Sequence, residues 1–125
     1  MKRLVFLCGV VVFGASCGLV GKRTTASDCD TWTDHYKEVA RKAMKKDYTK
    51  CNMDLKLVDK GIEDYHQSCR KHAGQKYEQK DADCYTQGKT YDDWIACNFA
   101  RTSVFWGYQD AIQIQKDLLE ELCAK

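Results

Sequence analysis

The chain has 125 residues, eight cysteines and no proline, and its formal net charge at pH 7 is +2. Four of the 20 Lys and Arg residues precede residue 24 and all 18 Asp and Glu residues follow it, so residues 24–125 carry a net charge of about −2. This balance excludes a general electrostatic affinity for nucleic acid or for anionic membranes. We therefore expect no nucleic-acid partner.

Residues 1–18 have the composition of a secretory signal peptide. Lys2 and Arg3 form a positive start, residues 4–13 are apolar, and small residues follow them. A membrane anchor is the competing interpretation, but the stretch after residue 13 is rich in Gly and Ser, and a spanning helix needs roughly 20 strongly apolar residues. We predict that residues 1–18 are cleaved, that the protein is secreted and extracellular, and that it makes no stable membrane insertion.

Residues 19–23 end in the basic pair Lys22 and Arg23. Such pairs are sites for furin-like or prohormone-type proteases, although they also occur by chance. We interpret residues 19–23 as a possible short propeptide. Residues 24–125 then form a single helical, disulfide-rich domain.

Two of the eight cysteines lie in residues 1–18, and six remain in the predicted mature chain, residues 24–125. An even number of cysteines in a short secreted protein predicts three disulfides, each of which typically contributes about 2–4 kcal/mol to stability. The six are Cys29, Cys51, Cys69, Cys84, Cys97 and Cys123.

The first predicted helix begins near Thr31, which with Asp34 has the pattern of a capping box. Its apolar stripe contains Cys29, Trp32, Tyr36, Val39 and Ala43. The other side is a basic face, which is either simply solvated or a second-choice site for an anionic partner. The basic face consists of Lys37, Arg41, Lys42, Lys45 and Lys46.

A second helix is indicated by apolar residues at alternating spacings of four and three, which form a narrow seam. The seam contains Cys51, Leu55, Val58, Ile62, Tyr65 and Cys69. Its register does not continue that of the first helix, so we predict a turn between residues 45 and 51. Gly74 is expected to end the helix.

The sequence His66-x-x-Cys69-x-x-His72 has a helical spacing that could bring three metal ligands near one face. In an oxidising compartment Cys69 is expected to be paired with another cysteine. We therefore predict no metal site and no cofactor.

Residues 75–89 are polar and predict a loop with one or two helical turns. Thr90 and Asp93 form another capping pattern, from which one helix is expected to run from Tyr91 to Cys123, with Gly107 softening its middle. The predicted fold class is all-α, a small disulfide-stapled bundle or array of three to four helices.

Helix lengths restrict the disulfide pairing. Cys51 and Cys69 lie about 27 Å apart on one helix and cannot pair. By the same argument Cys97 and Cys123 cannot pair, because both lie on the predicted C-terminal helix. A nested arrangement would suit antiparallel helices, with bonds Cys29–Cys123, Cys51–Cys97 and Cys69–Cys84.

The predicted C-terminal helix is apolar on two faces in its first half. The main face is expected in the core and contains Trp94, Val104, Phe105, Tyr108, Ala111, Ile112, Leu118, Leu119 and Leu122. The reverse face carries Ile95, Phe99 and Trp106. This face is either covered by another element or is a binding surface, since exposed Trp and Phe are typical interface anchors.

No motif of a nucleophile elbow, phosphate-binding loop, zinc protease or EF-hand occurs in the sequence. We therefore expect no enzyme. The leading hypothesis is a secreted binding effector, toxin-like or cytokine-like, that acts on an extracellular protein target. The alternatives are a carrier of a small hydrophobic ligand and a non-catalytic structural secreted protein.

Overall fold

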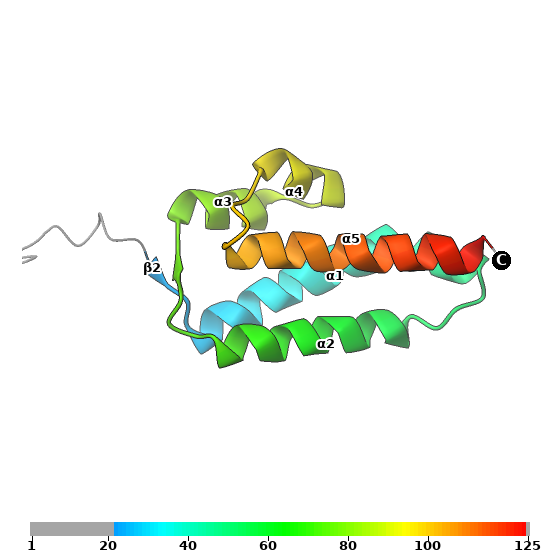
Figure 1. Ribbon diagram of the computed structural model, residues 1–125, viewed down its shortest axis with the longest axis horizontal. Coiled ribbons are helices and arrows are strands. Elements are labelled where there is room, and N and C mark those ends of the chain that lie inside the picture. The colour runs from blue at the N-terminus through cyan, green and yellow to red at the C-terminus, as the bar shows by residue number, and fades with distance from the viewer. Residues whose placement is uncertain (1–21, 125) are drawn as a thin grey trace, which may run out of the picture.

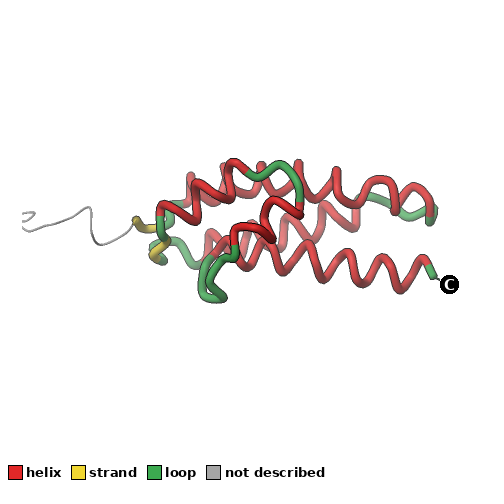
Figure 2. Tube along the Cα trace, turned by 90° about the horizontal axis from the view of Figure 1, so that it is seen from above, coloured by secondary structure: helices red, strands yellow, loops and turns green. Residues whose placement is uncertain are grey.

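The computed structural model describes residues 22–124, which form an all-α domain with one short strand pair (Figure 1). The long helices α1, α2 and α5 lie along the longest axis, and α3 and α4 pack beside them near one end (Figures 1 and 2). The described part contains five helices, one more than the largest number predicted. The elements are β2 (Lys22–Arg23), α1 (Ala26–Lys50), α2 (Lys56–Lys71), β3 (Lys76–Tyr77), α3 (Gln79–Gln87), α4 (Tyr91–Cys97) and α5 (Val104–Cys123).

Helix α1 starts earlier than the sequence pattern indicated. Thr25 is the N-cap, since its side chain accepts a hydrogen bond from the Asp28 amide and the Asp28 carboxylate accepts one from the Thr25 amide, both at 3.0 Å. The prediction of a cap at Thr31 was wrong because two Thr-x-x-Asp patterns follow each other. The earlier one caps the helix, and Thr31 lies inside it.

Helix α1 also continues beyond the predicted turn. Met44 and Tyr48 are buried and keep an apolar side on the helix as far as Lys50. Cys51 is the C-cap, and Asn52 has a left-handed backbone with φ of 60°. The turn between the helices therefore lies after Lys50, and Cys51 belongs to the end of α1 rather than to the seam of α2.

The predicted seam of the second helix is present in α2. Val58, Ile62 and Cys69 are buried in the interface, and Tyr65 is partly buried against the core. After α2, Gly74 has φ of +100°, a conformation that favours glycine. Its amide donates to the carbonyl of Thr24 at 2.6 Å, which places β3 antiparallel to β2.

The single helix predicted from Tyr91 to Cys123 is divided into α4 and α5. The Thr90–Asp93 capping box is present as predicted. Asn98, with φ of 54°, ends α4, and Ser103 caps α5 by accepting a hydrogen bond from the Phe105 amide at 3.2 Å. The break lies at Asn98 because Asn tolerates the left-handed conformation.

Gly107 lies inside α5, at the position where the predicted helix was expected to be less rigid. A Cβ atom at this position would lie 2.0 Å from the hydroxyl oxygen of Tyr65. The glycine therefore permits close packing of α5 against α2.

All six cysteines in residues 22–124 are in disulfides, but the nested pairing was wrong. The bonds are Cys29–Cys69, Cys51–Cys123 and Cys84–Cys97, with Cα atoms 5.8, 5.5 and 5.9 Å apart. The nested pairing assumed one long C-terminal helix. The chain instead turns between Gln87 and Tyr91, α4 folds back on α3, and Cys97 reaches Cys84 rather than Cys51.

The core at the α3–α4 end is a cluster of aromatic rings. Tyr36, Tyr85, Trp94, Phe105 and Tyr108 are fully buried. The rings of Tyr85 and Trp94 stack with centroids 4.8 Å apart. Stacked and tilted ring pairs of this kind add to the stability gained from burial alone.

The tyrosine hydroxyls of this cluster remain protonated at neutral pH. Burial raises the pKa of Tyr108 to about 12 and raises that of Tyr85 well above its ordinary value. The Tyr85 hydroxyl donates to the carbonyl of Trp32 at 2.9 Å, and the Tyr108 hydroxyl pairs with that of Thr33 at 2.9 Å. These bonds attach α3 and α5 to α1.

We predict that Trp94→Ala lowers the free energy of unfolding by about 3–5 kcal/mol, since it opens a cavity in the aromatic core. Trp106→Ala is the matched control, because Trp106 is only partly buried, and it should cost about 1 kcal/mol. Urea denaturation followed by circular dichroism measures both. Equal costs for the two variants would contradict the assignment of Trp94 as the centre of the core.

Candidate binding surfaces

The residues predicted as a binding surface, Ile95, Phe99 and Trp106, lie on different elements. Ile95 is on α4 and is 50% exposed. Phe99 follows α4 and is buried, with its ring 5.7 Å from that of Phe105. Trp106 is on α5 beneath the Arg101 guanidinium, which lies 5.2 Å from the ring centroid. Because the helix is broken, they share no helix face, and Phe99 is a core residue.

The predicted basic face is present on α1 except at Arg41. Lys37, Lys42, Lys45 and Lys46 are exposed. Arg41 forms an ion pair with Asp59 and so connects α1 to α2. The positive charges of α1 that form no ion pair in the described part are therefore those of its lysines.

The pair Lys22 and Arg23 forms β2, and both residues are exposed. The Arg23 guanidinium donates to the carbonyl of Gly74 at 2.9 Å, and Thr24 is buried. Proteolytic processing after Arg23 stays a prediction. The predicted signal peptide, residues 1–18, and residues 19–21 lie outside the described residues.

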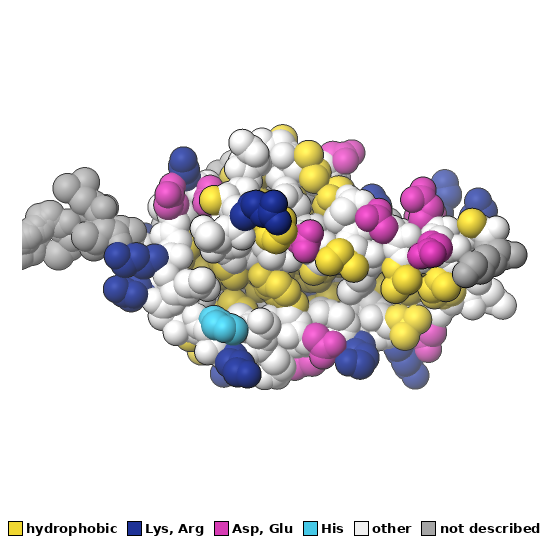
Figure 3. Space-filling model, viewed as in Figure 1, with side chains coloured by type: hydrophobic (Ala, Val, Ile, Leu, Met, Phe, Trp, Pro, Cys, Tyr) yellow, Lys and Arg dark blue, Asp and Glu magenta, His cyan; other side chains and the backbone are white. Residues whose placement is uncertain are grey.

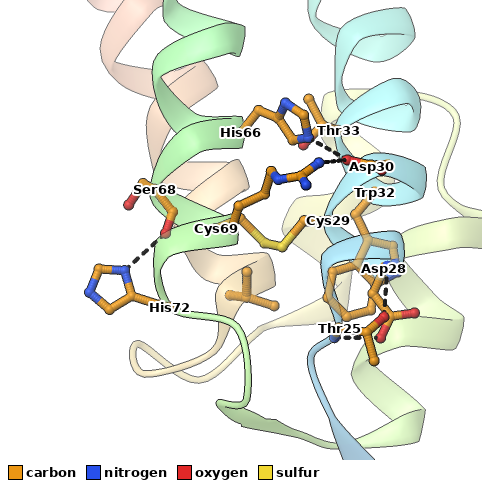
Figure 4. The surroundings of a disulfide bond; sticks show 12 residues. Thr25, Asp28, Cys29, Asp30, Trp32, Thr33, His66, Ser68, Cys69 and His72 are labelled. Carbon is orange, nitrogen blue, oxygen red and sulfur yellow. Dashed lines mark hydrogen bonds and ion pairs between the residues drawn. A yellow bond between two sulfur atoms is a disulfide. The ribbon is translucent and has the colours of Figure 1, made fainter.

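The three residues considered as metal ligands have other partners (Figure 4). Cys69 is bonded to Cys29. His66 Nε2 lies 2.7 Å from Asp30 Oδ1, whereas His72 points away from α1 and its Nδ1 lies 2.9 Å from the carbonyl oxygen of Ser68. These side chains do not converge on one point.

Asp30, His66 and Arg70 form a polar connection between α1 and α2 beside the Cys29–Cys69 disulfide. The Asp30 carboxylate accepts from Arg70 Nη1 at 2.8 Å and also contacts His66. The hydrogen bond with His66, followed by the charge of Arg70, lowers the pKa of Asp30 below its ordinary value. Asp30 is thus a charged anchor for two side chains of α2.

An apolar groove that was not predicted lies between α2 and α5. Its lining residues Leu57, Leu118 and Leu122 are 54, 53 and 44% exposed, and Ile114, on α5 outside the lining, is 58% exposed. We define the α2–α5 groove by its lining residues Tyr48, Met53, Leu57, Lys60, Gly61, Asp64, Gln115, Leu118, Leu119 and Leu122, which enclose about 320 Å³. Hydrophobic side chains gather along this boundary in Figure 3.

A signal for this groove was present in the sequence. Leu118 and Leu122 were assigned to the core face of the C-terminal helix, but only Ile112 and Leu119 are buried in its second half. Ile114, Leu118 and Leu122 recur every four residues and form a separate stripe beside the core face. A helix that buries one narrow face leaves such a second stripe exposed.

Two further grooves differ from this one because charged residues dominate their walls. The groove between α1 and α5 has a volume of about 560 Å³ and contains Asp47, Lys50, Lys116 and Glu120. The groove between α1 and α2 has a volume of about 680 Å³ and contains Asp30, Asp34, Asp59 and Glu63. The α2–α5 groove is the one that presents leucines to solvent.

No protein-family model, curated protein or solved structure matches this chain. Among residues 22–124, no helix has the length and apolar character needed to cross a membrane.

We predict that Asp30→Asn lowers stability at neutral pH and flattens its dependence on pH below about 4. Because the folded-state pKa of Asp30 is lowered, its contribution is present above the unfolded pKa and is lost as pH falls through the folded pKa. Urea midpoints measured from pH 7 to pH 2 test this prediction. Asp34→Asn, an exposed carboxylate on the same helix, is the control, and an equal effect of that variant would contradict it.

Proposed function

We propose that this protein is a secreted, non-catalytic binding protein that recognises an extracellular protein target through the α2–α5 groove. The observation that carries the proposal is the clustering of exposed apolar residues. Three of the five large hydrophobic side chains exposed in the described part, Leu57, Leu118 and Leu122, line this groove. The other two are Ile114 on α5 and Ile95 on α4. Contiguous apolar surface on a small protein is typical of interaction sites.

The shape of the groove favours an amphipathic helix as its partner. Ile114, Leu118 and Leu122 form an inclined apolar stripe on α5, and Leu57 of α2 lines the groove together with Leu118 and Leu122. A partner helix can lay its own apolar face along such a stripe. Covering each half-exposed Leu or Ile would contribute on the order of 1 kcal/mol.

Charge contributes little to this groove. The charged residues that line it are Lys60 and Asp64 of α2, whose side chains form an ion pair at 3.0 Å. Asp117 of α5 lines the groove between α1 and α5 instead. We therefore expect apolar contacts to dominate recognition by the partner helix.

The disulfide at this end of the bundle supports a preformed site. Cys123 follows Leu122, Cys51 lies two residues before Met53, and the two cysteines are bonded. The bond therefore fixes the end of α5, which carries Leu122, to the turn after α1, which leads to Met53, before binding. Preorganisation of this kind reduces the entropy lost when a partner binds.

The cysteines and histidines are consistent with secretion and with a non-catalytic role. Three disulfides are typical of proteins from oxidising compartments. His35 Nε2 contacts the carbonyl of Gly88 at 2.7 Å, while His66 and His72 have the partners given above. Each histidine ring thus contacts a structural group rather than a nucleophile.

A carrier of a small hydrophobic ligand is the second candidate. The volume of the groove, about 320 Å³, is within the range of small-molecule sites. Its leucines, however, are about half exposed, and a carrier site normally covers most of its ligand. This exposure favours a macromolecular partner.

We predict that Leu118→Glu weakens target binding at least tenfold, because it places a charge in the apolar stripe. The matched control is Ile95→Glu, since Ile95 is 50% exposed and Leu118 is 53% exposed. Saturable binding of the labelled, disulfide-bonded protein to intact cells of the source organism measures the effect, and thermal unfolding verifies that both variants fold.

Loss of binding in Ile95→Glu alone would move the site to the surface first predicted from the sequence. Absence of saturable binding by the unchanged protein would contradict the proposal. A native mass that exceeds the denatured mass by a small molecule would support the carrier instead.

A further inference from the structure

We infer that the C-terminal half of α1 binds a sulfated polysaccharide through a row of exposed lysines. We call this row the lysine stripe. It consists of Lys42, Lys45, Lys46 and Lys50 on α1, together with Lys89 from the connection between α3 and α4.

The lysine stripe is linear and held by rigid elements. Residues 42, 45, 46 and 50 lie on one side of a continuous helix, over a length of about 12 Å. Lys89 lies across a pocket of about 260 Å³ that Lys42 and Thr86 also line. His35 fixes this connection to α1 through the carbonyl of Gly88. The lysines thus extend from α1 onto a second element.

The positive charge of the stripe is not neutralised by ion pairs. Within residues 22–124, Arg41, Lys60, Arg70 and Lys80 each lie within 4.0 Å of a carboxylate oxygen, and no lysine of the stripe does. Glu38 is the one carboxylate that shares the pocket of Lys42 and Lys89, whereas Lys50 shares the groove between α1 and α5 with Asp47, Asp117 and Glu120. The local excess of positive charge is therefore centred on Lys42, Lys45, Lys46 and Lys89, on a domain whose net charge is about −2.

Helix electrostatics alone do not account for this arrangement. Cations stabilise a helix within its last turn, which explains Lys50 and adjacent positions. Lys42 lies eight residues before the end of α1, and Lys89 is not on α1. Their position beside the other lysines indicates a surface for a polyanion.

A sulfated polysaccharide fits this surface better than a lipid bilayer does. The five exposed large hydrophobic residues lie on α2, α4 and α5, so the stripe has no apolar side chain to insert into a membrane. Lysine ammonium groups are compact point charges that suit fixed, closely spaced anionic groups. Sulfated polysaccharides are found outside cells, so the biological meaning of this inference rests on the proposed secretion.

Heparin chromatography with a salt gradient tests the inference. The variant K42Q/K45Q/K46Q/K50Q removes four charges from the stripe, and the control K37Q/K56Q/K71Q/K76Q removes four exposed lysines elsewhere. We expect the unchanged protein and the control to be retained at about 0.15 M salt and the stripe variant to elute below it. The slope of log affinity against log salt should fall by about one for each stripe lysine engaged.

Equal loss of retention in both variants would overturn the inference, since it would reflect net charge alone. Failure of the unchanged protein to bind heparin at 0.15 M salt would also overturn the inference. Binding to phosphatidylserine vesicles without binding to heparin would do the same. Leu118→Glu should leave heparin retention unchanged. The result for the lysine stripe is therefore independent of the result for the α2–α5 groove.

Discussion

The Cys51–Cys123 disulfide is the constraint on which one end of the bundle depends, the end where both α1 and α5 terminate. It joins the turn after α1 to the end of α5, with Cα atoms 5.5 Å apart. In this part of α5 the buried apolar contacts are few, and Leu119 is the last buried residue. The disulfide fixes the end of α5 to the end of α1. Leu118 and Leu122 can therefore remain exposed while the helix keeps its position.

The other end of the domain is stabilised differently. Trp94, Tyr85 and Phe105 form a dense aromatic core, and Cys84–Cys97 holds the α3–α4 hairpin against it. Most apolar side chains at this end are buried, as Phe99 illustrates, although Ile95 is 50% exposed. The two ends thus differ in packing: one end has a dense aromatic core, and the other presents an apolar surface on a covalently fixed frame.

The sequence predicted features that depend on local pattern. The seam of α2, the capping box of Thr90 and Asp93, and the participation of all six cysteines in disulfides were confirmed. The helix break at Asn98 was missed because Gly107 drew attention to a later position, and Asn is a weaker signal for a left-handed residue than glycine.

That error placed Phe99 on an outer helix face, whereas it is buried. The pairing of cysteines and the location of the candidate surface depend on tertiary geometry, which a periodic pattern along one helix does not specify.

The basic face of α1 was recognised at Lys42, Lys45 and Lys46. Lys50 was not part of the predicted face, and Lys89 joins these lysines only through the fold.

The disulfide connectivity of the native protein tests this account most directly. Proteolysis without reduction, under conditions that prevent thiol exchange, followed by mass spectrometry of the linked peptides identifies each pair. The account predicts the pairs Cys29–Cys69, Cys51–Cys123 and Cys84–Cys97. A peptide that links Cys123 to Cys29, or Cys69 to Cys84, would contradict the frame that exposes the α2–α5 groove.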